Sequence, residues 1–141
     1  MSRLDTIIRL RKWELDEVRR ALTRLEEEGS AISDAMTELD RQLQAECAGS
    51  AAHEASVTLG PYITAVRQKK EQLQELLTAK NIEIEEKQDE VSQAYNELKK
   101  IEVARDRRLM DEKAERDRKE QAIADETGSR KFFESDRGSR S

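Results

Sequence analysis

An unbroken heptad pattern runs through the first third of the chain. Alternating steps of four and three residues from Leu4 meet apolar side chains everywhere except at Arg11 and Gly29. Such steps place apolar residues at the a and d positions of a coiled coil. The pattern leaves one narrow apolar stripe along a helix, so it predicts a long helix that requires a partner helix. The apolar positions are Leu4, Ile8, Leu15, Val18, Leu22, Leu25, Ile32, Met36, Leu39 and Leu43.

A second stretch repeats the pattern after a short break. From Leu59 to Ile101 the same steps meet apolar residues except at Lys70, Lys80 and Lys87. Beyond Ile101 the same phase meets charged residues from Arg105 to Lys119, although the composition still favours helix. Because Pro61 is tolerated only in the first turn of a helix, we expect this second helix to begin near Thr58.

Folding the chain back between the two seams explains why both end together. If Leu43 faces Leu59, each step along one helix matches a step back along the other, with Leu25 facing Leu77 and Leu4 facing Leu98. A parallel homodimer gives no reason for this coincidence. The sequence therefore predicts an all-α fold: a long two-helix antiparallel coiled-coil hairpin with a C-terminal single-helix overhang.

The element boundaries follow from local signals. Ser2 with Asp5 fits a capping box, so helix 1 is expected over about residues 3–46. The small residues of 47–58 form the connection, and helix 2 is expected over about 59–126.

Residues 1–126 are expected to form a single coiled-coil domain. The Gly/Ser/Arg-rich segment 127–141 is expected to be a disordered tail. Because the heptad phase is the same on both sides of Gly29, we expect that glycine to soften helix 1 without breaking it.

The composition excludes several classes of protein. Charged residues make up 40% of the chain and aromatics 4%, which suits long helices and not a globular core. A net charge of −5 argues against a nucleic-acid partner, because such binding depends on neutralising phosphates. With one cysteine, no secretory signal and no apolar run of membrane-spanning length, we expect a cytoplasmic protein without direct membrane insertion.

The chemistry-bearing residues do not form a catalytic or metal set. Cys47 and His53 are the single cysteine and histidine of the chain, and neither has a partner with which to bind a metal or activate a nucleophile. There is no phosphate-binding glycine loop. We therefore expect no enzyme activity, no cofactor and no metal.

The candidate sites are surfaces for protein partners. Trp13 lies at heptad position f, opposite the seam, with Leu10 one turn away at position c. Exposed aromatic residues are common binding anchors, so this pair is a candidate interaction site. On the second helix Tyr62 and Leu76 at g and Ile82 at f also lie off the seam, and flank packing is the simpler interpretation for Leu76.

The charged residues fall into two groups, those within the seams and those beyond Ile101. Arg11, Lys70, Lys80 and Lys87 within the seams keep their charge in water and help to fix register. Beyond Ile101, alternating charges indicate either a solvated single helix or one that is stable only when a partner encloses it.

Three motifs resemble the flagellar FliJ family. The segment LDTIIRLRKWELDEVRRAL at residues 4–22 is similar to the N-terminal segment of that family, and ERDRKEQAIADE at 115–126 is similar to its charged C-terminal segment, with Ala124 where the family has leucine. The pair Tyr62–Ile63 resembles the aromatic–isoleucine pair near the start of the family's second helix. The resemblance covers about residues 4–126.

The resemblance implies a non-enzymatic stalk of flagellar type III export. Such proteins insert into a hexameric export ATPase, promote its assembly, and connect it to the cytoplasmic part of the membrane-embedded export gate and to export chaperones. They are found in the cytoplasm, peripherally associated with the inner membrane at the flagellar base. Carried over to this sequence, ATPase contacts fall on Leu10, Trp13 and Asp125–Glu126, and gate contacts on Tyr62, Val66 and Lys69.

Two alternatives remain open at this point. The same physical features would serve the equivalent stalk of a virulence-type III secretion system. A generic structural coiled coil, assembling as a parallel dimer or a four-helix bundle, is the alternative from another class. The hairpin interpretation predicts a monomer in the absence of partners.

Overall fold

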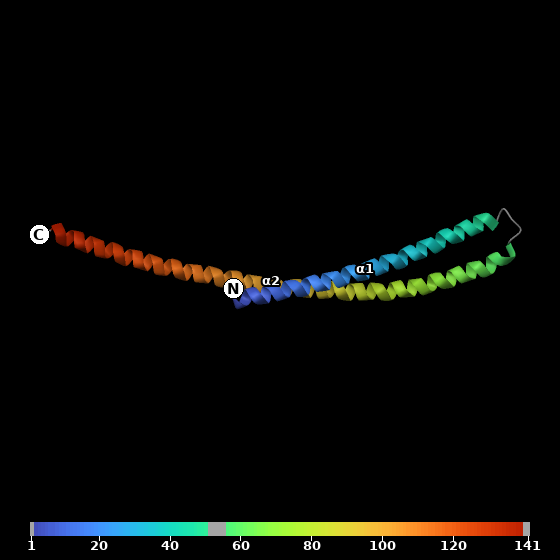
Figure 1. The fold of residues 1–141 in the computed structure, drawn as a ribbon, viewed down its shortest axis with the longest axis horizontal. Helices are drawn as coiled ribbons and strands as arrows, with labels where there is room; N and C mark the ends of the chain where they lie inside the picture. Colours follow the sequence, from blue (N-terminus) through green and yellow to red (C-terminus); the bar gives the residue numbers. More distant parts are fainter. Residues whose placement is uncertain (1, 51–55, 140–141) are drawn as a thin grey trace. The chain divides into compact units, whose positions relative to one another are not determined.

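The computed structural model describes residues 2–50 and 56–139 of the chain. Two helices account for nearly all of these: α1 (Arg3–Ser50) and α2 (Ser56–Ser139). No strand occurs among the described residues. The two helices pack against each other side by side and antiparallel (Figure 1), so the predicted all-α hairpin is confirmed.

Both helices extend further than their sequence signals suggest. α1 runs to Ser50 instead of 46, and α2 begins at Ser56, with Pro61 inside it. α2 also continues to Ser139, so the structure places residues 127–139 in a helix and not in a disordered tail. The ion pair between Glu126 and Arg130, 2.9 Å apart, spans the weak helix formers around Gly128 and stabilises this turn. His53 lies outside the described residues.

The chain divides into two compact units, each with its own packing. One consists of Leu10–Asn96, and the other of Met1–Arg9 together with Glu97–Ser141. We call residues 10–96 the paired segment, because α1 and α2 face each other along it. The grouping of residues 1–126 as a single domain stays a prediction.

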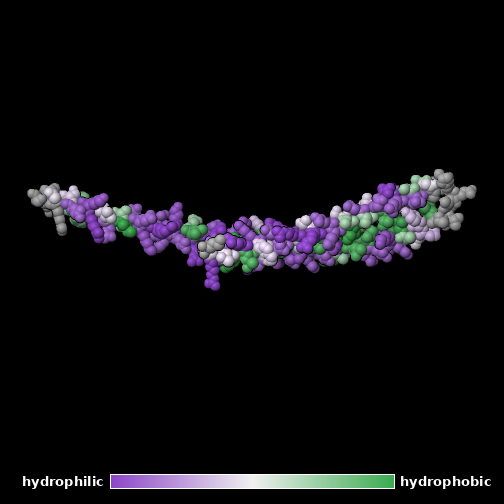
Figure 2. All heavy atoms as spheres, in the orientation of Figure 1, coloured by the Kyte–Doolittle hydropathy of each residue, from purple (hydrophilic) through white to green (hydrophobic). Residues whose placement is uncertain are grey.

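The heptad seams are the core of both units. Every a and d position from Leu4 to Leu43 and from Leu59 to Ile101 is buried or half-buried, including the basic ones. In Figure 2 the hydrophobic colour of the paired segment gathers between the helices, while hydrophilic residues cover their outer faces. α1 passes through Gly29 without a break, as predicted from a heptad phase that is the same on both sides of that glycine. The most buried side chains are Ile8, Leu15, Val66 and Leu98.

The register of the paired segment differs from the predicted one by one heptad. Lys80 Nζ lies 2.7 Å from Glu28 Oε2, and Lys70 Nζ lies 2.6 Å from Asp40 Oδ1. These contacts place Lys80 beside Gly29, and therefore Ile84, not Leu77, opposite Leu25. The predicted pairing was wrong because a seam that repeats every seven residues matches apolar residues equally well after a slip of one heptad.

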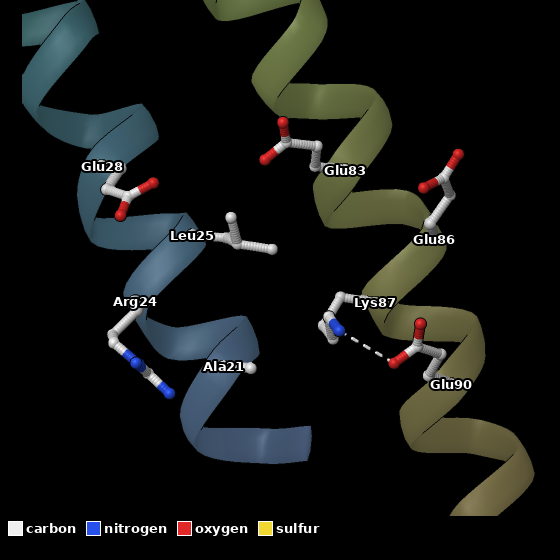
Figure 3. A pocket seen from close by; sticks show the side chains of 8 residues that line it. All are labelled: Ala21, Arg24, Leu25, Glu28, Glu83, Glu86, Lys87 and Glu90. Carbon is white, nitrogen blue, oxygen red and sulfur yellow. Dashed lines mark hydrogen bonds and ion pairs between the residues drawn. The ribbon is translucent and has the colours of Figure 1, made fainter. Parts of the chain in front are cut away.

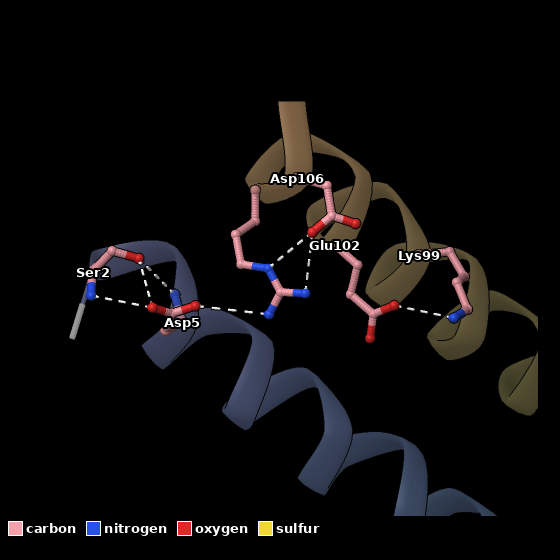
Figure 4. Close-up of polar contacts among 6 residues, drawn as sticks. Ser2, Asp5, Lys99, Glu102 and Asp106 are labelled. Atoms are coloured by element: carbon pink, nitrogen blue, oxygen red, sulfur yellow. Dashed lines mark hydrogen bonds and ion pairs between the residues drawn. The ribbon is translucent and has the colours of Figure 1, made fainter. Parts of the chain in front are cut away.

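The other compact unit, which contains the start of α1, shows the same shift from the predicted register. Arg105 Nη1 lies 3.7 Å from Asp5 Oδ1, so the start of α1 faces Arg105 instead of Leu98 (Figure 4). The predicted capping box is present: the Asp5 backbone N–H donates to Ser2 Oγ at 3.3 Å, and the Ser2 N–H donates to Asp5 Oδ2 at 3.3 Å. The Ser2 hydrogen bonds, with the Arg105 charge as a smaller cause, lower the pKa of Asp5.

Beyond this contact α2 has no helix opposite it. Every side chain from Asp106 to Asp136 is exposed, and we call residues 106–136 the single-helix segment. Its described ion pairs connect neighbouring turns of α2, as in Arg108–Glu112 at 3.4 Å. The predicted single-helix overhang is therefore confirmed. Within the described residues neither helix has an apolar stretch that meets the requirements of a membrane crossing.

Candidate partner-binding surfaces

Leu10 and Trp13 form an apolar patch on the outer face of α1. Their exposed fractions are 52% and 60%, as expected for heptad positions c and f. Three residues apart on a helix, the two side chains lie on one face. Beside them, Arg11 and Glu14 form an ion pair of 2.9 Å. An exposed tryptophan beside an exposed leucine can bury apolar area against a partner, with nearby charges as a polar rim.

The surface that continues from this patch carries both signs of charge. A shallow groove of about 670 Å³ follows α1 toward its middle and is lined by Asp16, Arg19, Arg20, Thr23, Arg24 and Glu27. Its three arginines and two carboxylates can form ion pairs and hydrogen bonds with a protein surface that carries both signs of charge.

The residues carried over as gate contacts lie at the other end of the paired segment. Tyr62 is half-buried beside the seam, and Lys69 is exposed. Val66 is only 5% exposed, because it is a seam residue of α2. A partner can therefore touch Tyr62 and Lys69 directly, whereas Val66 supports them by packing. Along α2 the distance between this site and the level of Trp13 is about 50 Å at 1.5 Å per residue.

Asp125 and Glu126 lie on the single-helix segment and are exposed. Gln121 Nε2 donates a hydrogen bond to Asp125 Oδ1 at 3.0 Å, and Arg130 pairs with Glu126. Both carboxylates thus have partners within α2 and still face solvent. Within the paired segment the Leu10–Trp13 and Tyr62–Lys69 sites lie at opposite ends, and Asp125–Glu126 belongs to the other compact unit.

A groove between the helices of the paired segment is rich in carboxylates. It encloses about 420 Å³ and is drawn in Figure 3, where Lys87 Nζ lies 2.9 Å from Glu90 Oε2. Nearby, the hydrogen bond to Glu28, supported by Glu83, raises the pKa of Lys80. No group of carboxylate, Cys or His side chains in the described ranges could hold a metal ion. The lining residues are Ala21, Arg24, Leu25, Glu28, Glu83, Glu86, Lys87 and Glu90.

Sequence reasoning missed several exposed apolar residues of α2. On the single-helix segment Met110, Phe132 and Phe133 are strongly exposed, and the rings of the two phenylalanines meet edge to face with centroids 6.2 Å apart. The available signal was the presence of large apolar residues where the seam phase had ended. The other exposed residues of this kind are Tyr95, Val103, Leu109 and Ile123.

Comparisons with known proteins bear directly on the resemblance. A search of curated proteins and a search of solved structures find no match. The family model described as "Flagellar FliJ protein" matches residues 1–137, which is nearly the whole chain. The match covers both helices of the hairpin and the single-helix segment together. The resemblance is thereby confirmed, and the chain belongs to the FliJ family of flagellar proteins.

Proposed function

We propose that this protein is the stalk and adaptor of a flagellar type III export apparatus. It inserts into the hexameric export ATPase, promotes assembly of the ring, and connects the ring to the export gate and to export chaperones. It works in the cytoplasm, at the inner membrane of the flagellar base. The observation that carries this proposal is the match of the FliJ family model to residues 1–137.

The role is mechanical and not catalytic. FliJ proteins are export adaptors and not enzymes, and a long hairpin with a continuous seam suits a stalk because its packing is distributed along its whole length. The single-helix segment adds an extended charged surface with no helix of its own chain against it. A ring of subunits can contact such a segment from all sides.

The ATPase contacts fall on two surfaces. The patch of Leu10 and Trp13 supplies an apolar anchor, and its exposure supports this assignment. Asp125 and Glu126 supply exposed carboxylates that can pair with basic groups of the ring. The gate contact falls on Tyr62 and Lys69, with Val66 holding the local packing.

Deletion of the gene in the native organism tests the function. We expect loss of motility, and co-purification of the tagged protein with a hexameric ATPase from wild-type cytoplasm. A deletion strain that swims normally overturns the proposal. If that strain instead loses secretion of virulence proteins, the stalk belongs to the alternative secretion system.

A pair of variants tests the ATPase anchor. Trp13→Ala removes the exposed indole, whereas Ile82→Ala removes an aliphatic group of similar exposure from the outer face of α2. We expect Trp13→Ala to lose ATPase co-purification while Ile82→Ala keeps it, with equal helicity by circular dichroism. Equal retention by both variants contradicts the anchor assignment.

A further inference from the structure

The basic residues in the seam do more than tolerate partial burial. We propose that the paired segment can form two registers one heptad apart, and that Lys80 with Glu28 and Gly29, assisted by Lys70 with Asp40, selects the observed one. We call these five residues the register lock. This property goes beyond the proposed function, because it belongs to the hairpin itself.

Apolar packing does not decide between the two registers. In the observed register Leu25 faces Ile84, and Met36 faces Leu73. After a slip of seven residues Leu25 faces Leu77 and Met36 faces Val66. Both arrangements match apolar residues along most of the seam, because both helices keep their heptad phase throughout. The choice must therefore come from residues that break the apolar pattern.

Lys80 and Gly29 are complementary in the observed register. A Cβ at Gly29 would lie 3.7 Å from Lys80 Cγ, an ordinary contact distance, so the lysine stem packs directly over the glycine. The Lys80 ammonium then reaches Glu28 on α1 at 2.7 Å and Glu83 on its own helix at 3.3 Å. After the slip Lys80 would face Leu22, flanked by Ala21 and Thr23, with no carboxylate at the matching position of α1.

Lys70 also forms an ion pair across the helices that a slip of one heptad would break. Its ammonium pairs with Asp40 across the helices at 2.6 Å. After the slip Lys70 would face Ile32, flanked by Ala31 and Ser33, and would lose that ion pair. A lysine at a seam position is known to specify register in coiled coils at some expense of stability.

Lys87 provides the internal control. Its ion pair at 2.9 Å is with Glu90 on the same helix, so a slip leaves that contact intact. After the slip Lys87 would face Leu15, flanked by Glu14 and Asp16. Lys87 is therefore a seam cation that does not favour the observed register.

The lock is accessible to partners. The Glu28 side chain is 57% exposed, so a cationic group of a bound protein can compete with Lys80 for it. A slip of one heptad moves α2 along α1 by about 10 Å. Binding at the lock would therefore change how much of α2 lies opposite α1.

Disulfide trapping distinguishes the two registers. In a Cys47→Ser background, Leu25→Cys with Ile84→Cys reports the observed register, and Leu25→Cys with Leu77→Cys reports the slipped one. Both pairs join a d position to an a position, so their geometry is matched. With the lock intact we expect cross-linking of the first pair only.

Lys70→Gln with Lys80→Gln should raise cross-linking of the slipped pair several-fold and lower that of the first pair. Lys87→Gln should neither raise cross-linking of the slipped pair nor lower that of the first pair, because its ion pair with Glu90 lies within α2. Salt at 1 M, where the Debye length is about 3 Å, should act in the same direction as the double variant. Circular dichroism establishes that each variant remains helical.

Two results overturn the proposal. One is a helical double variant in which the slipped pair stays uncross-linked. The other is an equal effect of Lys87→Gln, because that would make any seam charge, and not the lock, responsible. If a lysine variant loses helicity, cross-linking in 1 M salt takes its place, because both lysines are then unchanged. Cross-linking of the slipped pair in salt supports the proposal, and its absence overturns it.

Discussion

The paired segment and the single-helix segment are both α-helical but are held in helical form by different interactions. In the paired segment an apolar seam is buried, and the ion pairs of Lys70 and Lys80 cross between α1 and α2. In the single-helix segment every side chain is exposed, and ion pairs such as Arg118–Glu115 stay within α2. The paired segment is therefore stabilised by contacts between two helices, and the single-helix segment by contacts within one.

The difference predicts two kinds of unfolding. Burial of the seam couples the turns of both helices, so the paired segment should unfold cooperatively. The single-helix segment depends on helix propensity and on pairs worth a few tenths of a kcal/mol each, so it should fray gradually. The following substitutions test that contrast, beginning with the largest effect.

The largest effect is expected from shortening a leucine. Leu15 is 4% exposed, and Leu15→Ala removes buried apolar volume, which typically lowers the free energy of unfolding by about 2–5 kcal/mol. Leu109→Ala makes the same chemical change on an exposed side chain and should leave the thermal midpoint nearly unchanged. Thermal denaturation followed by circular dichroism measures both. Similar losses in the two variants would remove the distinction between the segments.

Filling a glycine should stabilise the two segments differently. A Cβ at Gly29 meets Ile84 Cδ1 at 3.5 Å, an ordinary contact, so Gly29→Ala should raise the free energy of unfolding by about 1 kcal/mol through helix propensity. Gly128→Ala meets nothing within 4 Å. It should increase local helicity without moving the cooperative midpoint. A destabilised Gly29→Ala would mean that the space beside Lys80 is already fully used.

Acid should weaken the N-terminal contact of Asp5. Its pKa is lowered in the folded chain, so its contribution is complete above the unfolded value of about 3.9 and is lost as pH falls through the folded value. Asp5→Asn should therefore remove the contribution of Asp5 to the pH dependence of the free energy of unfolding below about pH 4. Thermal midpoints of both proteins between pH 2 and 7 measure this, and parallel pH profiles would contradict it.

The smallest effect is expected from the ion pair at the weak turn of α2. Glu126→Gln should lower helicity near Gly128 slightly and leave the midpoint of the paired segment unchanged, because the pair with Arg130 is exposed. Amide hydrogen exchange of residues 121–136 measures the change. Loss of protection within residues 10–96 would show that the two segments are coupled more tightly than their contacts indicate.

Sequence alone predicted the interactions that depend on periodicity. The seam positions, the antiparallel hairpin and the Ser2–Asp5 cap follow from spacing and from side-chain chemistry, and the structure contains all three. The exposure of Trp13 followed from its place opposite the seam. These features are local or repeat along the helix, so each residue carries its own signal.

The register and the helix ends could not be obtained in this way. Pairing Leu25 with Leu77 or with Ile84 satisfies the same apolar pattern. The two registers are separated by ion pairs across the helices: Lys80 with Glu28, Lys70 with Asp40, and Arg105 with Asp5. The helix also continues beyond Glu126 through Gly128 to Ser139, although the Gly/Ser/Arg-rich composition there favours a tail. The partner roles of Tyr62, Lys69 and Asp125 remain predictions, because an exposed side chain alone does not identify what binds it.

The strict seven-residue repeat also constrains how hairpins of this kind can change length during evolution. An insertion in one arm that is not a multiple of seven would break the heptad phase and require local overwinding or unwinding of the coiled coil. Matched gains or losses of whole heptads in both arms preserve all the facing pairs. Natural relatives should therefore differ in reach by increments of about 10 Å, with the bend and both ends retained.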